Sequence, residues 1–419
     1  MGAIVKVAQV MRRFVPGKWG GTESVVFNSA LELQRRGIAS PIFCTDMFAR
    51  PGQELVDGVP VQRFPYVFPW LFLSAEARAK LELKGGSPLS LGLLRALWRE
   101  PGVSLIHTHV QHRLGGMART VARQRGIPYV ASIHGGWFTM PADQRERMQD
   151  PFRGKPEWGR LFGWLLGARR TLDDAAGIIC VGRDEQAAVR QRFPRQSAQI
   201  HYLPNGVRVA RFRDAAPELF RQRFNFQPTD RLVLCVSRLD YQKNQLLLVR
   251  AFAEFAKLHP CHRLVLIGAA TVAAYHQEIL AEVTRLELGD RVTIIPGLLP
   301  DDPLLPSAYR AAEMFVLPTA HEPFGIVILE AWAAGVPVIA TRIGGIPGFT
   351  THNVNIRLFE NGDGGRLEVE LALLADHPEW RERLSAAARQ EVAAQYDWSR
   401  IGDRLLEIYE AAAHRPALA

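Results

Sequence analysis

Cysteine is scarce in this 419-residue sequence. The cysteines are Cys44, Cys180, Cys235 and Cys261. Four widely spaced cysteines are too few for a disulfide framework or a thiolate zinc site, so we expect a reducing, cytoplasmic setting. The first residues lack the charged and apolar regions of a secretory signal, and the longest apolar candidate, residues 326–340, is broken by Glu330, Gly335 and Pro337. No run approaches the roughly 18 apolar residues of a membrane span.

The remaining composition is that of a folded globular protein. Apolar residues make up 47% of the chain and charged residues 22%, and the 35 glycines and 27 prolines are scattered. This excludes disordered, collagen-like and coiled-coil classes. The length predicts two or three domains.

The net charge of +9 is unevenly distributed. Residues 1–204 carry 28 Lys+Arg against 16 Asp+Glu, whereas residues 205–419 carry 23 against 26. The basic half is interpreted either as a solvated surface or as a face for anionic lipid or an anionic acceptor. Nucleic acid is not an expected partner, because the arginines are dispersed and no nucleic-acid-binding module accompanies them.

Short, β-branched apolar runs alternate with helical patterns throughout the chain, which predicts two doubly wound α/β domains with parallel sheets. The expected strands are Ile4–Val10, Pro41–Cys44, Leu105–His109, Tyr129–Ile133, Ile178–Val181, Leu232–Val236, Leu264–Ile267, Val292–Ile295, Met314–Leu317 and Val336–Ala340. A Pro and an Asn-Gly pair at residues 204–206 place the boundary between domains 1–204 and 205–396.

Two segments stand apart from this alternation. The C-terminal segment 397–414 carries Ile401, Leu405 and Ile408 on one stripe, with Asp397 or Ser399 as cap, and we expect this helix to pack back on the first domain. The segment 66–98, which begins with an aromatic stretch, fits no strand–helix unit, and we interpret it as an insertion over the crevice between the domains. Loops at the carboxyl ends of parallel strands line such a crevice, so the functional residues are expected there.

The strongest local signal is the segment from Glu322 to Glu330 after an expected strand. Pro323 suits the first position of a helix, and Gly325 lets backbone amides approach a ligand, which predicts an anion cradle at a helix N-terminus. Glu330 lies two turns into an apolar helix, where its carboxylate is expected to accept hydrogen bonds from polar groups such as ribose hydroxyls. The structural alternative is that Glu322 is a helix cap and Glu330 an ordinary half-buried carboxylate.

A second signal follows the strand 232–236. Arg238 and Lys243 stand in the next loop, where two cations can neutralise a diphosphate without a metal ion. The alternative is a plain charged surface turn.

Histidines and glycines mark the first domain. His134 ends a strand and is expected to face the crevice, although it also suits a purely structural role. His107 and His109 share one face of a strand, an arrangement open to metal binding, to lining the crevice or to packing.

Gly20 and Gly21 allow close backbone approach or form a simple turn. They are not a dinucleotide fingerprint, because no G-x-G-x-x-G follows the first strand.

Across these motifs the sequence resembles the family-4 glycosyltransferases, which are retaining, nucleotide-sugar-dependent enzymes of the GT-B fold. The resemblance covers most of the chain. The segments that carry it begin at Trp19-Gly20-Gly21-Thr22-Glu23, His134-Gly135-Gly136, Leu203-Pro204-Asn205-Gly206, Arg238, Glu322, Gly344-Gly345-Ile346-Pro347 and Tyr396-Asp397-Trp398-Ser399.

The resemblance implies a role for each candidate residue. Arg238 and Lys243 would bind the donor diphosphate, and Glu322 would hold hydroxyls of the donor sugar. The amides of Phe324, Gly325 and Ile326 would assist, Glu330 would bind the ribose, and His134 would approach the sugar. Gly20 and Gly21 would lie near the phosphates and the acceptor.

The implied reaction is transfer from a nucleotide sugar, UDP favoured over GDP, to a glycan, lipid-linked or small-molecule acceptor held by the basic domain. No metal or other cofactor is expected, and the diphosphate would leave from the face that the acceptor attacks. The loop 348–357 departs from the family pattern, which bears on donor identity. Alternatives are a sugar phosphorylase, a sugar-nucleotide epimerase or an inactive nucleotide-sugar-binding partner. Residues 66–73 are expected either to contact an anionic membrane, in a protein peripheral to its inner face, or simply to pack against the first domain.

Overall fold

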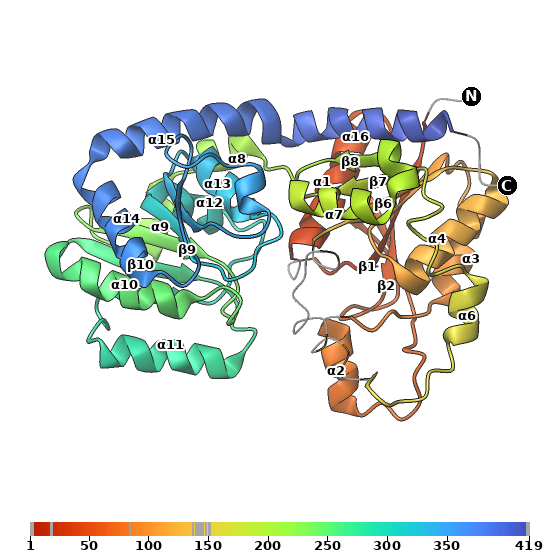
Figure 1. Ribbon diagram of the computed structural model, residues 1–419, viewed down its shortest axis with the longest axis horizontal. Coiled ribbons are helices and arrows are strands. Elements are labelled where there is room, and N and C mark those ends of the chain that lie inside the picture. Colours follow the sequence, from red (N-terminus) through yellow and green to blue (C-terminus); the bar gives the residue numbers. More distant parts are fainter. Residues whose placement is uncertain are drawn as a thin grey trace. The chain divides into compact units, whose positions relative to one another are not determined.

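The computed structural model describes residues 4–16, 20–83, 85–135, 138, 146, 149 and 152–415. The chain divides into two compact units, coloured along the sequence in Figure 1. Unit 1 comprises Met1–Pro204 and Ile401–Ala419, and unit 2 comprises Asn205–Arg400. Each unit is a wholly or mainly parallel sheet with helices on both faces, so the predicted doubly wound α/β architecture is confirmed.

The sheet of unit 1 has the order β3-β4-β2-β1-β5-β6-β7-β8, parallel except for the β3–β4 hairpin. Its strands are β1 (Val7–Arg13), β2 (Ile42–Thr45), β3 (Gly52–Val56), β4 (Val59–Phe64), β5 (Leu105–Thr108), β6 (Tyr129–Ile133), β7 (Gly177–Cys180) and β8 (Ile200–Tyr202). Its described helices are α1 (Gly21–Arg35), α2 (Ala75–Leu83), α3 (Leu91–Arg99), α4 (His112–Arg125), α6 (Arg160–Leu165), α7 (Arg183–Arg192) and the 3₁₀ turn η2 (Pro194–Gln199).

The sheet of unit 2 is wholly parallel, in the order β11-β10-β9-β12-β13-β14. Its strands are β9 (Arg231–Val236), β10 (His262–Ile267), β11 (Val292–Ile295), β12 (Ala312–Leu317), β13 (Val338–Thr341) and β14 (Arg357–Phe359). Its helices are α8 (Val209–Arg213), α9 (Pro217–Arg223), α10 (Gln245–Leu258), α11 (Ala273–Arg285), α12 (Leu304–Ala311), α13 (Ile326–Ala334), α14 (Gly364–Asp376) and α15 (Pro378–Glu391), with short turns η3 (Ile346–Gly348) and η4 (Val392–Tyr396).

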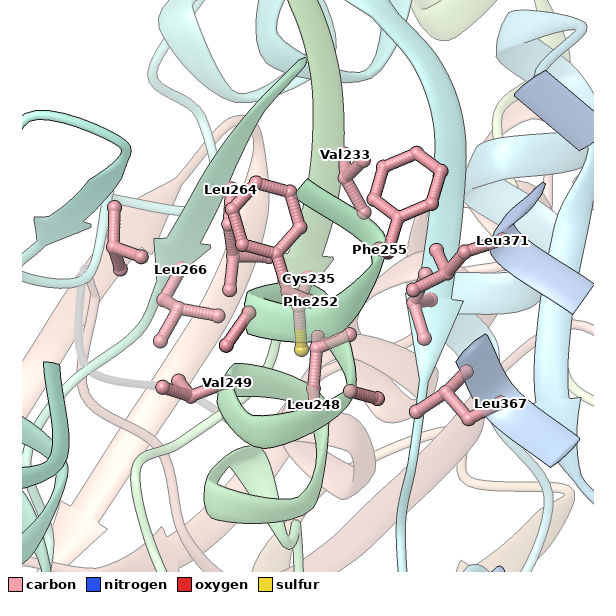
Figure 2. Packing of buried hydrophobic residues seen from close by; sticks show 14 of the residues in the cluster. Val233, Cys235, Leu248, Val249, Phe252, Phe255, Leu264, Leu266, Leu367 and Leu371 are labelled. Atoms are coloured by element: carbon pink, nitrogen blue, oxygen red, sulfur yellow. The ribbon is translucent and has the colours of Figure 1, made fainter. Parts of the chain in front are cut away.

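Figure 2 shows one layer of the core of unit 2, where α10 packs on β9 and β10. Phe252 and Leu248 of α10 are fully buried and lie in one cluster with Val233, Leu264 and Leu371. Burial of a side chain of this size contributes about 1.5–3 kcal/mol. The core fixes the strand ends, and with them the loops that follow β9 and β12.

All ten strands expected from the sequence are present, within a few residues of their predicted ends. The prediction missed β3, β4, β8 and β14, which are edge or near-edge strands. β3 is exposed along most of its length and so lacks an apolar run. β8 and β14 have three residues each, which is too short for a distinctive apolar run.

The expectation of an insertion at 66–98 is wrong for its last part. Helix α3 begins at a capping serine, because Ser90 Oγ accepts a hydrogen bond from Leu93 N at 3.3 Å. Leu93 and Leu97 are fully buried in the main core of unit 1. Since α3 lies between β4 and β5 in the chain and packs on the sheet, it is an ordinary crossover helix.

The final helix, α16 (Trp398–Ala413), is capped by Asp397, whose Oδ1 accepts a hydrogen bond from Ser399 N at 3.0 Å. From Ile401 onward its residues belong to unit 1. Tyr409 is fully buried there, and its hydroxyl lies 2.6 Å from His107 Nδ1. No helix in the described part of the chain has both the length and the apolar character needed to cross a membrane.

Candidate functional site

Two loops meet at the carboxyl edge of the sheet in unit 2. They follow β9 and β12, which are neighbours in the sheet, so residues about 80 positions apart become adjacent. Lys243 Nζ lies 2.7 Å from Glu322 Oε2, and the two side chains are only 14% and 11% exposed. The structure therefore brings together a cation and a carboxylate that the sequence assigned to separate motifs.

Backbone and side-chain hydrogen bonds join the same loops. Ala320 N donates to Gln242 O at 2.8 Å, Gln242 Nε2 donates to His321 O at 3.0 Å, and Thr319 Oγ1 donates to Gln242 O at 2.9 Å. These bonds hold Lys243 and Glu322 in place without depending on their own ion pair.

The helix after Glu322 begins later than predicted. α13 starts at Ile326, and Gly325 is its N-cap with φ of +101°, so Pro323 is not the first helical residue. Gly325 is required by this left-handed backbone, which a side chain would strain. No side chain caps the helix, and the first N–H groups of a helix have no acceptor within it. The amides at Gly325 and Ile326 therefore form a partial positive charge suited to an anion.

Two glycines, Gly344 and Gly345, pack against this turn. A Cβ on Gly344 would lie 2.2 Å from Glu322 O, and a Cβ on Gly345 would lie 2.0 Å from Pro323 O. Gly345 N also donates to Glu322 O at 2.9 Å. The glycine pair thus lets the chain pack directly on the Glu322 backbone and holds it in position.

The atypical loop 348–357 supports the same turn. Phe349 is buried and stacks on Phe324, with ring centroids 4.5 Å apart, and its ring also meets Trp332 of α13 edge-on. The Phe324 side chain is therefore part of the core, and only its backbone amide is a candidate for ligand contact.

Arg238 has a different environment from Lys243. Its guanidinium Nη1 lies 3.1 Å from Asp240 Oδ2, and its side chain is 55% exposed. Asp240 is buried and also accepts a hydrogen bond from Lys243 N. An exposed arginine of this kind can turn toward a ligand at little cost, since exposed ion pairs contribute roughly 0–1 kcal/mol.

Glu330 is half-buried and has a partner that sequence reasoning missed. Tyr309, from α12, donates its hydroxyl to Glu330 Oε2 at 2.6 Å. Burial raises the pKa of Glu330, while the hydrogen bond from Tyr309 and the positive charge of Arg211 oppose this rise. Burial, together with the charge of Glu330, also raises the pKa of Tyr309 far above its ordinary value. No local signal at Tyr309 points to Glu330, because α12 and α13 meet only in the folded unit.

Two histidines of unit 1, His109 and His134, are hydrogen-bonded to each other at the carboxyl ends of β5 and β6. His109 Nδ1 lies 2.8 Å from His134 Nε2, and the two rings stack. His107 is bonded instead to Tyr409 and Ser132. Among the described residues, no group of three or more His, Cys, Asp or Glu side chains is arranged to hold a metal ion.

Gly20 precedes α1, and Gly21 is its first residue. Gly20 N donates to Glu23 Oε2 at 3.0 Å, and Arg13 Nε lies 3.3 Å from the other oxygen of Glu23. The backbone of Gly20 has no positive φ, so its conformation does not itself demand glycine.

Known proteins resemble the chain along almost its whole length. Residues 20–206 match the model of the glycosyl transferase 4-like domain, and residues 217–391 match that of glycosyl transferases group 1. The D-inositol 3-phosphate glycosyltransferase of Nocardiopsis dassonvillei is 30% identical over 406 residues, 94% of this chain and 90% of that protein. The protein of the same name from Segniliparus rotundus is 29% identical over 415 residues, 96% of this chain and 87% of that protein.

Solved structures show the same fold. Anabaena Alr3699/HepE in complex with UDP-glucose superposes with a TM-score of 0.72 at 19% identity, over 97% of this chain and 99% of that one. A glycosyltransferase from Rickettsia africae superposes with a TM-score of 0.74 at 16% identity, over 98% and 99% of the two chains.

Proposed function

The chain belongs to the family-4 glycosyltransferases of the GT-B fold, and on that premise we propose that it transfers a hexosyl unit from a UDP-sugar, with retention of configuration, to an anionic acceptor. Glycosyl transfer with a nucleotide-sugar donor is the activity of the family. The choice of UDP is supported by the UDP-glucose bound to the Anabaena neighbour. The observation that carries the proposal is the Lys243–Glu322 pair beside the uncapped N-terminus of α13.

We propose that Lys243, Arg238 and the amides of Phe324, Gly325 and Ile326 bind the donor diphosphate. Charge accumulates on this group as the sugar departs, and fixed cations and amide dipoles stabilise it. Because the chain itself supplies two cations, the proposed reaction needs no metal ion.

The two glutamates would then contact the rest of the donor. Glu330 Oε2 is occupied by Tyr309, and in the described part of the chain no hydrogen-bond partner of Oε1 is found, so we propose that Oε1 accepts from a ribose hydroxyl. Glu322 would accept from hydroxyls of the sugar while Lys243 balances its charge. We assign no carboxylate nucleophile; the acceptor would attack from the side on which the diphosphate leaves, and a phosphate oxygen would take its proton.

The roles proposed in unit 1 rest on the resemblance. His134 would contact the donor sugar, and Gly20 and Gly21 would approach the phosphates and the acceptor. Gly20 N is already bonded to Glu23, so a phosphate there would have to displace that carboxylate or use neighbouring amides.

The acceptor is proposed to be anionic, because residues 1–204 carry 12 more basic than acidic residues. The curated relatives are named for an acceptor of this kind, D-inositol 3-phosphate. Phosphorylated small molecules and lipid-linked glycans share this chemistry, and an acceptor screen separates them.

A peripheral contact with anionic lipid, at the cytoplasmic face of a membrane, is a further part of the proposal. Phe68 is buried with Met47 and Leu81, whereas Phe72 is 81% exposed. Trp164 of α6 is 76% exposed, and α6 has no buried residue. Residues 152–170 carry five basic side chains and one acidic one, a combination suited to a lipid surface.

Sedimentation with vesicles tests this contact. We expect the protein to sediment with vesicles of phosphatidylglycerol at low salt and the variant Trp164→Ala to do so less. Equal binding to neutral vesicles, or no binding to either kind, contradicts a contact with anionic lipid. Self-association that depends on Trp164 would point to a second copy of the chain instead.

The donor is tested by thermal unfolding in the presence of UDP, GDP, ADP and their sugars. A preferred nucleotide sugar raises the melting temperature by mass action, and we expect UDP-sugars to raise it most. Transfer to inositol phosphate, followed by NMR of the anomeric proton, tests retention. Turnover with inorganic phosphate, or isomerisation of the donor without acceptor, would favour the phosphorylase or epimerase alternative; binding without any turnover would favour an inactive partner.

A further inference from the structure

A row of polar side chains crosses three neighbouring strands of unit 1. Gln9 lies on β1, His109 follows β5 and His134 follows β6. His134 Nε2 lies 2.8 Å from His109 Nδ1, and His109 Nε2 lies 2.8 Å from Gln9 Oε1. Gln9 is fully buried and His109 is 5% exposed, so water does not replace these bonds.

The far end of the row determines the direction of its hydrogen bonds. Gln9 Nε2 donates to Ser40 Oγ at 3.0 Å, and Ser40 Oγ in turn donates to Val7 O at 3.3 Å. The backbone carbonyl of Val7 can only accept, so the Ser40 hydroxyl proton is committed to it. Ser40 Oγ must then accept from the Gln9 amide nitrogen, which leaves Gln9 Oε1 facing His109 as an acceptor.

This direction passes along the row to His134. His109 must carry its proton on Nε2 to donate to Gln9 Oε1. Burial lowers the pKa of His109 well below the ordinary histidine value, so the ring is neutral and its Nδ1 is an acceptor. His134 therefore donates from Nε2. Burial also lowers the pKa of His134, to about 4, so at neutral pH its Nδ1 bears a lone pair.

His134 Nδ1 is the open end of the row. In the described part of the chain no hydrogen-bond partner is found for this nitrogen, and the atom is not fully enclosed by protein. We propose that Gln9 and His109 are positioning residues that hold His134 in the Nε2–H tautomer, so that Nδ1 accepts a hydrogen bond from a hydroxyl of the donor sugar. The assignment of the sugar rests on the proposed function, whereas the tautomer does not.

His107 provides an internal comparison. It lies on β5 two residues before His109, and its ring centroid is 3.9 Å from that of His109. Its nitrogens contact two hydroxyl groups, Tyr409 at 2.6 Å and Ser132 at 2.7 Å. The Tyr409 hydroxyl also interacts with Gln9, but neither contact of His107 involves His109 or His134. Ser132 is thus a matched site for a control variant, buried like Gln9 but outside the row.

NMR of the full-length protein labelled with ¹⁵N-histidine tests the tautomer directly. Two-bond proton–nitrogen correlations distinguish a protonated ring nitrogen from an unprotonated one, and the spectrum of His134→Gln identifies the signals of His134. At neutral pH we expect the Nε2–H tautomer at both His109 and His134. The Nδ1–H form or a charged ring at His134 would overturn the proposal.

Variants of Gln9 test whether the row sets this state. Gln9→Met removes the acceptor at similar length, and we expect mixed tautomers at His134. Loss of one hydrogen bond predicts a decrease of about fivefold in kcat/KM for the donor. Gln9→Glu keeps an acceptor oxygen and should retain the tautomer, and Ser132→Ala should leave His134 unchanged.

The outcomes separate the two proposals. An unchanged His134 tautomer in Gln9→Met, or a changed tautomer with unchanged kcat/KM, overturns the positioning role. A wild-type protein that has the expected tautomer but neither binds nor turns over any nucleotide sugar contradicts the proposed function and the sugar contact, while the tautomer assignment stands.

Discussion

The carboxyl edges of the two sheets use polar groups in opposite ways. In unit 2, Lys243 and Glu322 are charged partners 2.7 Å apart and nearly buried. In unit 1, His109 and His134 are neutral rings whose pKa values are lowered by burial. A lysine held at a fixed position is suited to balancing the charge of a diphosphate, whereas neutral donors and acceptors are suited to hydroxyl groups. If the proposed function holds, charge stabilisation falls to unit 2 and recognition of uncharged groups to unit 1.

Removing the Lys243 side chain should have the largest effect on the rate of transfer. Lys243→Ala deletes a charge proposed to stabilise the leaving diphosphate, and loss of one such group costs about 10²–10³ in rate. Steady-state kinetics with the preferred UDP-sugar measures this. Lys257→Ala is the matched control, because Lys257 is also on the loop–helix segment after β9 but pairs with Glu254 on an exposed face.

The same variant leaves Glu322 without its partner, so its thermal unfolding must be measured alongside and the kinetics recorded below the transition. If the Lys243→Ala protein is folded and its kcat/KM is unchanged, Lys243 does not stabilise the charge of the leaving diphosphate.

A smaller effect is expected at Tyr309. Tyr309→Phe removes the hydrogen bond to Glu330 Oε2, and we expect KM for the donor to rise about fivefold with little change in kcat. That hydrogen bond lowers the pKa of Glu330, so its loss raises the pKa further. If the ionised carboxylate binds the ribose, donor binding weakens as pH falls through this pKa, and the weakening begins at higher pH in the variant.

Tyr275→Phe is the control for this measurement. Tyr275 is also buried in unit 2, and its hydroxyl accepts a hydrogen bond from Leu246 N at 3.1 Å. Equal changes of KM in the two variants would mean that Tyr309 acts only through the stability of the unit.

In unit 1 the expected effect is on acid stability and not on catalysis. The pKa values of His107, His109 and His134 are lower in the folded chain than the ordinary value of 6.5, because burial disfavours the charged ring. The unfolded chain therefore binds more protons as pH falls through 6.5, and stability decreases toward about pH 4. Each such histidine should contribute a loss of about 1.4 kcal/mol between pH 7.5 and 5.5.

Urea unfolding of the wild type and of His109→Gln at these two pH values measures this contribution. The variant should lose less stability on acidification than the wild type. Equal losses would show that the histidine row is not the acid-sensitive part of unit 1.

Much of this structure was predictable from local sequence. Buried parallel strands are continuous apolar runs, so all ten of the expected strands were found. β3 and α3 were missed because an exposed edge strand lacks such a run and the aromatic segment before α3 obscured an ordinary crossover. The start of α13 was placed too early, because Pro323 gave a strong signal while the left-handed backbone of Gly325 is visible only in the structure.

The candidate site divides in the same way. Sequence alone could select the charged residues of the site, because a charge beside an apolar strand or within an apolar helix is costly unless it has a partner or a ligand. These residues are Arg238, Lys243, Glu322 and Glu330. Their partners could not be selected: Tyr309 meets Glu330 from another helix, and Gly345 meets Pro323 across the turn.

The succession of strands along the chain, the identity of the charged residues and the glycine positions are local properties. They follow from side-chain volume, charge and backbone freedom at each position. Which lysine neutralises which glutamate, and which nitrogen of His134 carries a proton, depend on contacts between segments 25 to about 100 residues apart. Those contacts exist only after the strands align, since hydrogen-bond direction and desolvation are fixed by neighbours in space and not by neighbours in sequence.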